Sequence, residues 1–351
     1  MALVARTLSG PLVVEVRARA IESLGDLLTD RRIVTTGRVA IAVGSGVADG
    51  VRGAVESAVP GAPVSEVDGG SLAAARTLAD GLRGSRPDVL VGIGGGGSLD
   101  VAKWAATAIG VPFVSVATTL THDGLASPVA VLEEDGYKGS YGVQPPIAVV
   151  VDLDLVRAAP ANHTRSGIGE AVSNLSAVAD WVLARRHVAE AYDGLAAAMA
   201  TTAALAVLNE GRETTDDAFL ETLAGALVVS GLAMTAAGTS RPCSGACHEI
   251  SHAIDRLFPR TALHGEQVAV GALFASFVRG DRRTAEIDTC FRVHGVPRLP
   301  GDLGLDAAGF TAAVVAAPGT RPGRYTILEH LDMDAPTIRE RVDAFIEAFD
   351  R

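Results

Sequence analysis

The chain has 351 residues, 48% of them hydrophobic, and its formal net charge at pH 7 is −11. This length favours two domains, and the hydrophobic content predicts well-filled cores with little disorder. The negative charge argues against a nucleic-acid partner or an anionic membrane surface. A phosphorylated substrate remains compatible with it, because a metal ion or a helix dipole can outweigh a diffuse field locally.

The first 160 residues alternate short apolar runs with helical patterns. Near-continuous apolar runs lie at residues 39–43, 89–93, 113–116 and 147–151, with a more polar candidate at 64–67. Such runs are typical of strands buried on both faces of a parallel sheet. Helical patterns lie between them at residues 47–59, 72–83 and 98–109. This βαβ alternation predicts a Rossmann-like, nucleotide-binding domain over residues 1–161.

A strand, a glycine turn and a helix start follow one another in residues 89–103. The turn and the first helical turn hold Gly94, Gly95, Gly96, Gly97, Ser98, Leu99 and Asp100. Glycines let the backbone approach a pyrophosphate, and a helix N-terminus supplies free N–H donors. The spacing satisfies GxGxxG, but the loop follows the third strand and no acid ends the next one, so the usual dinucleotide fingerprint is incomplete. A tight turn without a ligand is the alternative, and Lys103 in this arginine-rich chain hints at a site for a compact ammonium.

Hydroxyl groups and a His-Asp pair follow the next strand. The residues are Thr118, Thr119, Leu120, Thr121, His122 and Asp123, with Ser127 shortly after. Folds of this class place ligands at the carboxyl ends of strands, where Asp123 can orient a substrate hydroxyl and His122 can bind or carry a proton. An Asx or ST turn is the alternative. Residues 123–142 break the βαβ alternation and predict a hairpin or a lid.

After about residue 160 the strand-like runs stop and successive helices are expected. They lie at residues 168–188, 189–210, 216–236, 247–257, 266–279 and 336–349. We therefore expect an α/β plus all-α fold, with a helical metal- and substrate-binding domain over residues 162–351 and an active-site cleft between the domains.

Three of the eight histidines, His248, His252 and His264, fall close together in this helical part. His248 and His252 are four residues apart and therefore lie on one face of a helix. Neutral imidazoles gathered in this way indicate a divalent metal site, or a metal site with a proton relay. The alternative is two exposed helix histidines and one loop histidine.

Thiols, termini and apolar runs predict the compartment. The cysteines are Cys243, Cys247 and Cys290. This odd, sparse set predicts no disulfide framework and fits a reducing cytoplasm. The N-terminus carries Arg6 and Glu15 without an apolar stretch suited to a signal peptide. The longest apolar runs, residues 195–208 and 225–238, are too short to span a bilayer, so we expect a cytoplasmic protein without membrane insertion.

Together these motifs resemble the sn-glycerol-1-phosphate dehydrogenase family, in the superfamily of dehydroquinate synthases, glycerol dehydrogenases and iron-containing alcohol dehydrogenases. The resemblance runs nearly end to end, and its motifs lie at residues 94–103, 118–128, 166–181 (SGIGEAVSNLSAVADW), 240–255 (SRPCSGACHEISHAID), 263–267 (LHGEQ) and 321–329 (RPGRYTILE). It implies a dehydroquinate synthase-like fold with the active site in the cleft between the two domains.

The resemblance also implies roles for individual residues. The cofactor contacts would be Gly94, Gly95, Gly96, Gly97, Ser98, Leu99, Asp100, Lys103, Thr118, Thr119, Leu120, Thr121 and Ser127. Asp123 and His252 would contact the substrate, and Glu170, His248 and His264 would hold the metal and place the substrate beside it. The dehydrogenases have an aspartate where this chain has Glu170, and dehydroquinate synthases are similar in using glutamate. Cys247 stands where the family usually has an acid.

The activity implied is reversible hydride transfer between NAD(P)H and a small ketone, above all dihydroxyacetone phosphate, which would give sn-glycerol 1-phosphate. Zinc, or another divalent ion such as Fe²⁺ or Ni²⁺, would stabilise the developing alkoxide. His252 is the candidate for relaying the proton, with Asp123 beside it. Arg241 is the candidate for binding the phosphate bidentately, and an exposed turn arginine is the alternative for it.

Other functions remain open at this point. A sugar-phosphate cyclase resembling dehydroquinate synthase is favoured by Glu170 and opposed by the 121–124 and 321–329 motifs. A diverged polyol or alcohol dehydrogenase of a specialised pathway and a non-catalytic binding protein are further alternatives. Ser45 follows Gly44 where an acid would select NAD, so both NAD and NADP are retained. Apolar helical surfaces predict a homo-oligomer.

Overall fold

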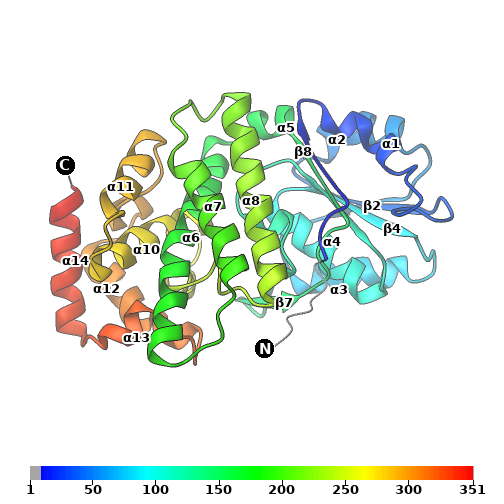
Figure 1. The fold of residues 1–351 in the computed structure, drawn as a ribbon. Helices are drawn as coiled ribbons and strands as arrows, with labels where there is room; N and C mark the ends of the chain where they lie inside the picture. Colours follow the sequence, from blue (N-terminus) through cyan, green and yellow to red (C-terminus); the bar gives the residue numbers. More distant parts are fainter. Residues whose placement is uncertain (1–8, 351) are drawn as a thin grey trace, which may run out of the picture. The chain divides into compact units, whose positions relative to one another are not determined.

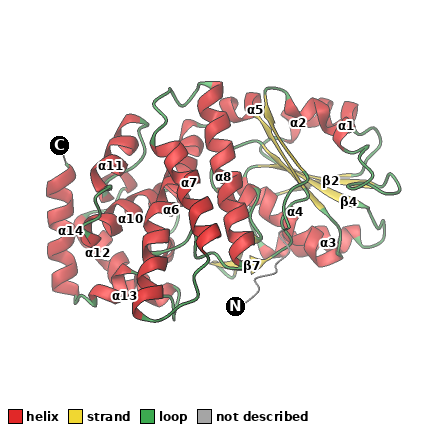
Figure 2. Ribbon diagram, in the orientation of Figure 1, coloured by secondary structure: helices red, strands yellow, loops and turns green. Residues whose placement is uncertain are grey.

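A computed structural model describes residues 9–350. These residues form two compact units. The first runs to Thr119 and resumes over Gly124–Ala159, and the second consists of Leu120–Asp123 and the chain from Pro160 onward. The large sheet belongs to the first unit, whereas the chain after it is helical (Figure 1, Figure 2). The expected domain boundary after residue 161 stays a prediction, and Arg6 lies outside the described residues.

The first unit contains a six-stranded parallel sheet in the order β1-β8-β5-β4-β2-β3. Its strands are β1 (Val13–Arg17), β2 (Val39–Gly44), β3 (Val64–Val67), β4 (Val89–Gly94), β5 (Phe113–Ala117) and β8 (Ala148–Asp152). Every residue of β2, β4, β5 and β8 is buried, as their continuous apolar runs predict. The edge strand β1 was not expected, because its sequence alternates apolar residues with charged ones and only one side is paired, to β8.

Helices connect these strands and confirm the Rossmann-like fold class. The connections include α2 (Ala48–Ala58), α3 (Leu72–Leu82), α4 (Gly96–Ile109) and the short helices α1 (Leu24–Leu27) and α5 (Leu153–Ala158). Val51 and Val55 of α2 belong to the same buried cluster as Ile41 and Val91 of the sheet. Helix α2 is therefore held to the sheet by apolar burial, the dominant favourable term in such packing.

The order in which successive strands are added to the parallel sheet reverses between β2 and β4. Strand β3 lies on one side of β2, whereas β4, β5, β8 and β1 follow on the other side. In doubly wound folds, ligands bind beyond the carboxyl ends of the strands at such a reversal. The glycine turn follows β4, so the fold itself places it where a nucleotide would bind.

A hairpin confirms one of the two interpretations of residues 123–142. Strands β6 (Val129–Glu134) and β7 (Tyr137–Gly142) pair antiparallel after a short 3-10 turn, η2 (Asp123–Leu125). Asp135 and Gly136 both have positive φ, as a two-residue hairpin turn requires. The Asp100 carboxylate accepts a hydrogen bond of 3.0 Å from the Val131 amide, which ties the hairpin to α4.

The second unit is built from helices. They are α6 (Ala161–His187), α7 (Gly194–Leu208), α8 (Asp217–Ala237), α9 (Ala246–Leu257), α10 (His264–Arg279), α11 (Thr284–Val293), α12 (Ala307–Ala316), α13 (Ile327–Leu331) and α14 (Ala335–Phe349), with 3-10 turns η3 (Pro300–Leu303) and η4 (Ala317–Thr320). The predicted all-α character is confirmed. Helix α6 begins earlier than expected, and α11, α12 and α13 were not predicted, because five to ten residues carry too short an apolar period to recognise.

Helix α8 is longer than the apolar run from which it was predicted. It has 21 residues and contains a window of mean hydropathy 1.6, so by length and composition it is long enough to cross a bilayer. The expectation that this run is too short was therefore wrong. However, 61% of that window is buried inside the protein, as in the core helix of a globular fold.

Helices α6 and α10 approach each other so closely that their backbones touch. A methyl group added at Gly265 would lie 2.0 Å from the carbonyl oxygen of Ser166, and one added at Gly169 would lie 2.3 Å from that of Gly265. No side chain fits at either position. This contact places Glu170 and His264, each next to one of these glycines in sequence, near one another.

We predict that Gly265→Ala destabilises the protein by about 1–3 kcal/mol, because the added methyl group forces the two helices apart. The measurement is the shift in urea unfolding midpoint followed by circular dichroism. Gly225→Ala is the matched control, since Gly225 lies within α8 with open space around it. That change should leave stability equal or raise it by about 0.5–1 kcal/mol. Equal stability of Gly265→Ala and the wild type would contradict the packing constraint.

Candidate metal centre and nucleotide loop

Three side chains from three helices of the second unit converge on one point. Glu170 comes from α6, His248 from α9 and His264 from the start of α10, and their ligand atoms lie within 4.8 Å of one another. The Nε2 atoms of His248 and His264 each lie 3.8 Å from a different oxygen of the Glu170 carboxylate. One carboxylate and two imidazoles suit a divalent ion and leave a coordination position for a substrate.

The Glu170 carboxylate is the strongest indication that a cation belongs here. The residue is 5% exposed, and its Oε2 atom receives no hydrogen bond within the described residues. Burial favours the neutral acid, but a hydrogen bond from His248 and the charges of His264 and His248 outweigh it and hold the pKa of Glu170 at about 2. A buried anion with an unpaired oxygen is costly, and a metal ion would satisfy it. The residues therefore fit the metal.

A chain of hydrogen bonds orients His264. Its Nδ1 lies 3.0 Å from the Ser251 oxygen, and the Ser251 hydroxyl donates to Gln267 Oε1 at 2.8 Å. Gln267 Nε2 in turn donates to Asp255 at 3.1 Å. Because the Ser251 proton is committed to Gln267, His264 donates from Nδ1 and keeps the Nε2 lone pair toward Glu170. Burial lowers the pKa of His264 to about 4, so the ring stays neutral.

These supporting groups were not predicted from the sequence. Ser251 and Gln267 lie inside the two histidine motifs, but only the folded structure shows that their side chains meet. A polar residue within a few positions of a candidate ligand is the signal that would have pointed to them.

His248 is held differently, by Cys247. Its Nδ1 lies 3.4 Å from the Cys247 sulfur, so a thiol takes the place of the acid that the resembling family usually has. Burial disfavours a charged ring, but Cys247 and Glu170 outweigh it and raise the pKa of His248 to about 10. A metal ion must displace that proton to bind Nε2. His248 is buried, so the interpretation of exposed helix histidines is wrong for it.

His252 and His122 lie near this centre. The His252 ring is 6.4 Å from the His248 ring and 6.2 Å from the His264 ring, and Arg321 Nε donates to its Nδ1 over a long 3.5 Å. His122 and Asp123 follow β5 in sequence but belong to the second unit. His122 is among the groups that lower the pKa of Glu170, so its ring lies close to the metal ligands.

Arg241 is placed differently from either expectation. It is only 3% exposed, so the interpretation as an exposed turn arginine is wrong. Its Nε and Nη2 atoms donate to the two oxygens of Glu190, each at 2.6 Å, and Nη2 also donates to the Tyr325 carbonyl. The edge that would bind a phosphate bidentately is therefore occupied, and Nη1 is left buried with no hydrogen-bond partner in the described part of the chain.

The glycine loop presents unpaired polar groups in the first unit. Helix α4 begins at Gly96 with Gly95 as its N-cap, and no side chain caps its first N–H groups. Gly94 has a φ of 154°, and a methyl group added there would lie 2.9 Å from the Ser98 Cβ. The hydroxyls of Thr118 and Thr119 are buried and have no hydrogen-bond partner among residues 9–350. Free amides at a helix N-terminus and unpaired hydroxyls suit a pyrophosphate.

Other predicted cofactor contacts serve the fold in this structure. Lys103 is completely buried, donates to the Gly124 carbonyl at 2.6 Å, and lies 3.1 Å from Asp100 Oδ1. This explains a lone compact ammonium better than a ligand does. The Ser127 hydroxyl donates to the Val129 carbonyl at 3.2 Å. The buried side chains of Leu99 and Leu120 leave only their backbones for contact with a cofactor.

Comparison with known proteins gives relatives across most of the chain. The family model of iron-containing alcohol dehydrogenases matches residues 15–160. A protein of Thermococcus sibiricus named glycerol-1-phosphate dehydrogenase (NAD(P)+) is 39% identical over 249 residues, which cover 70% of this chain and 71% of that one. The protein of the same name from Cenarchaeum symbiosum is 38% identical over 258 residues, covering 73% and 72%.

The solved structures support the fold. A probable glycerol dehydrogenase from Sinorhizobium meliloti superposes with a TM-score of 0.78 at 22% identity, covering 97% of this chain and 98% of that chain. A glycerol dehydrogenase from Schizosaccharomyces pombe gives a TM-score of 0.72 at 18% identity, covering 97% and 90%. At this level of identity the likeness concerns the arrangement of the sheet and the helices.

We predict that His264→Ala loses stoichiometric zinc and that Ser251→Ala weakens zinc binding by about 10–100-fold, because Ser251 orients the ligand histidine. Zinc content after dialysis, measured by mass spectrometry, and competition with a chelator test both variants. His163→Ala is the control, since His163 lies outside the ligand group. Unchanged zinc affinity in both site variants would show that the metal binds elsewhere.

Proposed function

Because the chain belongs to the glycerol-1-phosphate dehydrogenase family, within the iron-containing alcohol dehydrogenases, we propose that it reduces dihydroxyacetone phosphate to sn-glycerol 1-phosphate with NAD(P)H. It is an NAD(P)-dependent oxidoreductase that acts on a small molecule. The observation that carries the proposal is the group formed by Glu170, His248 and His264, in which a buried anion and two imidazole nitrogens face one point.

These three residues would hold the divalent ion. When bound, the ion supplies a Lewis acid that stabilises negative charge developing on the carbonyl oxygen, while NAD(P)H supplies the hydride. The protein contributes the orientation of the ligands. Ser251 fixes His264 through Nδ1, and Cys247 lies against Nδ1 of His248, so both rings present Nε2. Imidazole nitrogens suit zinc, iron and nickel alike, so which metal is bound depends on its availability as much as on the geometry of the site.

We assign the glycine loop to the nucleotide. The free N–H groups at the start of α4 and the hydroxyls of Thr118 and Thr119 would bind its pyrophosphate. No acid follows Gly44 at the end of β2, so a 2′-phosphate meets no repulsion there. This supports use of either NADH or NADPH.

We assign to His252 the transfer of the proton that completes the alcohol product. Arg321 donates to Nδ1 of this ring, so a neutral His252 carries its proton on Nε2. From that atom the neutral ring can donate a hydrogen bond to the product oxygen, and after taking up a second proton from solvent the imidazolium can release one to the alkoxide and return to the neutral ring, with Asp123 binding a substrate hydroxyl nearby. The cyclase alternative rests on Glu170 alone, and the named relatives are dehydrogenases.

The setting of the reaction follows from other features. The three cysteines are free and buried, which supports the cytoplasm as compartment. Leu12 and Val14 beside and within edge strand β1 are 47% and 45% exposed, which supports association into a homo-oligomer.

The activity is tested with zinc-loaded protein, dihydroxyacetone phosphate and either NADH or NADPH. We expect stoichiometric oxidation of the nicotinamide and formation of the sn-1 enantiomer, read by chiral analysis of the product. A cyclase would turn over a sugar phosphate with no net oxidation of the cofactor, and a binding protein would do neither. Absence of nicotinamide oxidation with this ketone would refute the proposed activity.

His252→Gln should lower kcat by about 10²–10⁴-fold, the usual contribution of a positioned proton donor, while zinc content stays at the wild-type level. His163→Ala serves again as the control. A wild-type kcat in the His252 variant would remove the residue from the mechanism.

A further inference from the structure

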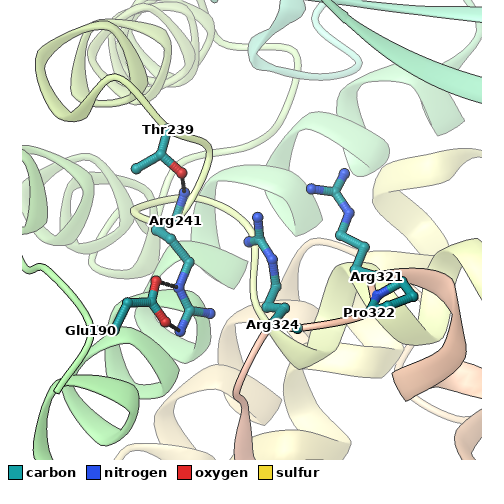
Figure 3. Close-up of a pocket in the computed structure, with 7 residues that line it drawn as sticks. Glu190, Thr239, Arg241, Arg321, Pro322 and Arg324 are labelled. Atoms are coloured by element: carbon teal, nitrogen blue, oxygen red, sulfur yellow. Dashed lines mark hydrogen bonds and ion pairs between the residues drawn. The ribbon is translucent and has the colours of Figure 1, made fainter. Parts of the chain in front are cut away.

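The second unit contains a cavity of about 280 Å³ that the roles assigned above do not use (Figure 3). It is lined by residues 239 and 241, by residues 321–324 and by Glu190. We propose that this cavity is the phosphate subsite, in which Arg321 and Arg324 bind the phosphate monoester of the substrate. This inference rests on the proposed function and adds the residues that would select a phosphorylated ketone over an unphosphorylated one.

A tight turn brings the two arginines together. In Arg321-Pro322-Gly323-Arg324, the Arg324 amide donates to the Arg321 carbonyl at 3.1 Å, and Gly323 has a φ of 86°. Proline at the second position and a glycine with positive φ at the third are the pattern of a type II turn. Such a turn places its first and fourth residues close together, and both guanidinium groups extend toward the same side in Figure 3.

The cavity carries uncompensated positive charge. Its lining holds three arginines and one carboxylate, and that carboxylate, Glu190, is bound by Arg241. Two positive charges are therefore left over, which matches a phosphate dianion. Within residues 9–350, neither Arg321 nor Arg324 forms an ion pair with an acid. They donate instead to the His252 ring, to the Ser244 carbonyl and to the Ser240 hydroxyl, which lies 3.3 Å from Arg321 and 3.1 Å from Arg324.

The surroundings keep this charge available. Burial and the nearby charges of Arg321 and Arg241 lower the pKa of Arg324 to about 10, so the group is still cationic at neutral pH but is destabilised in a way that an anion would relieve.

A second, independent observation points to a ligand. Arg241 is 3% exposed, and its buried Nη1 atom has no hydrogen-bond partner among the residues that the structure describes. An unsatisfied guanidinium donor in a buried position is costly, and a phosphate oxygen would satisfy it. Figure 3 shows the Arg324 guanidinium between those of Arg241 and Arg321, so one anion can lie among all three.

The cavity is also connected to the reaction centre. Arg321 donates to His252, whose ring lies 6.2 Å from that of the ligand histidine His264. A short phosphorylated ketone can therefore place its phosphate among the arginines while its carbonyl reaches the metal ligands. Arginine suits this task, since its planar fork matches phosphate oxygens in pairs.

Arg321→Gln and Arg324→Gln test the subsite. Each removes one charge-assisted contact, so the preference for dihydroxyacetone phosphate over dihydroxyacetone, taken as the ratio of the two kcat/KM values, should fall by about 10–100-fold. Arg321→Lys and Arg324→Lys keep the charge without the fork and should retain an intermediate preference. Arg339→Gln is the matched control, because Arg339 pairs with Asp343 on the exposed face of α14; its ratio should equal that of the wild type.

A binding measurement separates this inference from the proposed activity. Titration calorimetry of the zinc-loaded protein with inorganic phosphate should show binding that both glutamine variants lose. Phosphate binding that depends on the arginines, in a wild type that reduces no dihydroxyacetone phosphate, would support the subsite and refute the activity. Reduction of that ketone with an unchanged preference in both variants would support the activity and overturn the subsite.

A further variant covers the case in which the glutamine variants do not fold. Ser240→Asp places a carboxylate between Arg321 and Arg324, where the serine hydroxyl already accepts from both. This protein should fold, because the new acid satisfies the two cations, but it should lose phosphate binding by calorimetry. A folded Ser240→Asp protein that binds phosphate like the wild type would overturn the assignment.

Discussion

The buried carboxylate of Glu170 is the constraint on which the arrangement of the helical unit depends. A buried negative charge on α6 is tolerated only if positive charge and hydrogen bonds surround it. Histidines on two other helices meet this requirement in part, and the unpaired Oε2 atom shows that they do not meet it fully. Helices α9 and α10 are therefore arranged around a point that calls for a cation, and the chemistry of the protein is set by what that cation can polarise.

Backbone contacts make this arrangement rigid. Gly169 and Gly265 let α6 and α10 touch, so Glu170 and His264 follow from positions at which any side chain would collide. Gly167 lies equally close to the Leu120 carbonyl, which fixes the segment that carries His122 and Asp123 against the same helix. Glycine allows the two backbones to touch here, and this contact fixes the positions of the ligand residues next to the glycines.

The sequence predicted those parts of the molecule in which the signal is local. Strands β2, β4, β5 and β8 are continuous apolar runs, and His248 and His252 lie one helical turn apart. Other features could not be predicted in this way, because each depends on a partner distant in sequence. They are the burial of Arg241, the structural role of Lys103 and the hydrogen bond from Ser251 to Gln267. Arg321 and Arg324 lie between these cases, since their Pro-Gly turn is local but its neighbours are not.

The net charge of the whole chain also says little about the charge at one site. A net charge of −11 suggests a protein that repels anions, yet at physiological ionic strength a charge acts over only about 8 Å. At the arginine cavity, the one lining carboxylate, Glu190, is bound by Arg241, so the charges of Arg321 and Arg324 are left uncompensated there. An acidic protein can therefore offer a site for a phosphate ester, because the carboxylate that lines the cavity is already paired with an arginine.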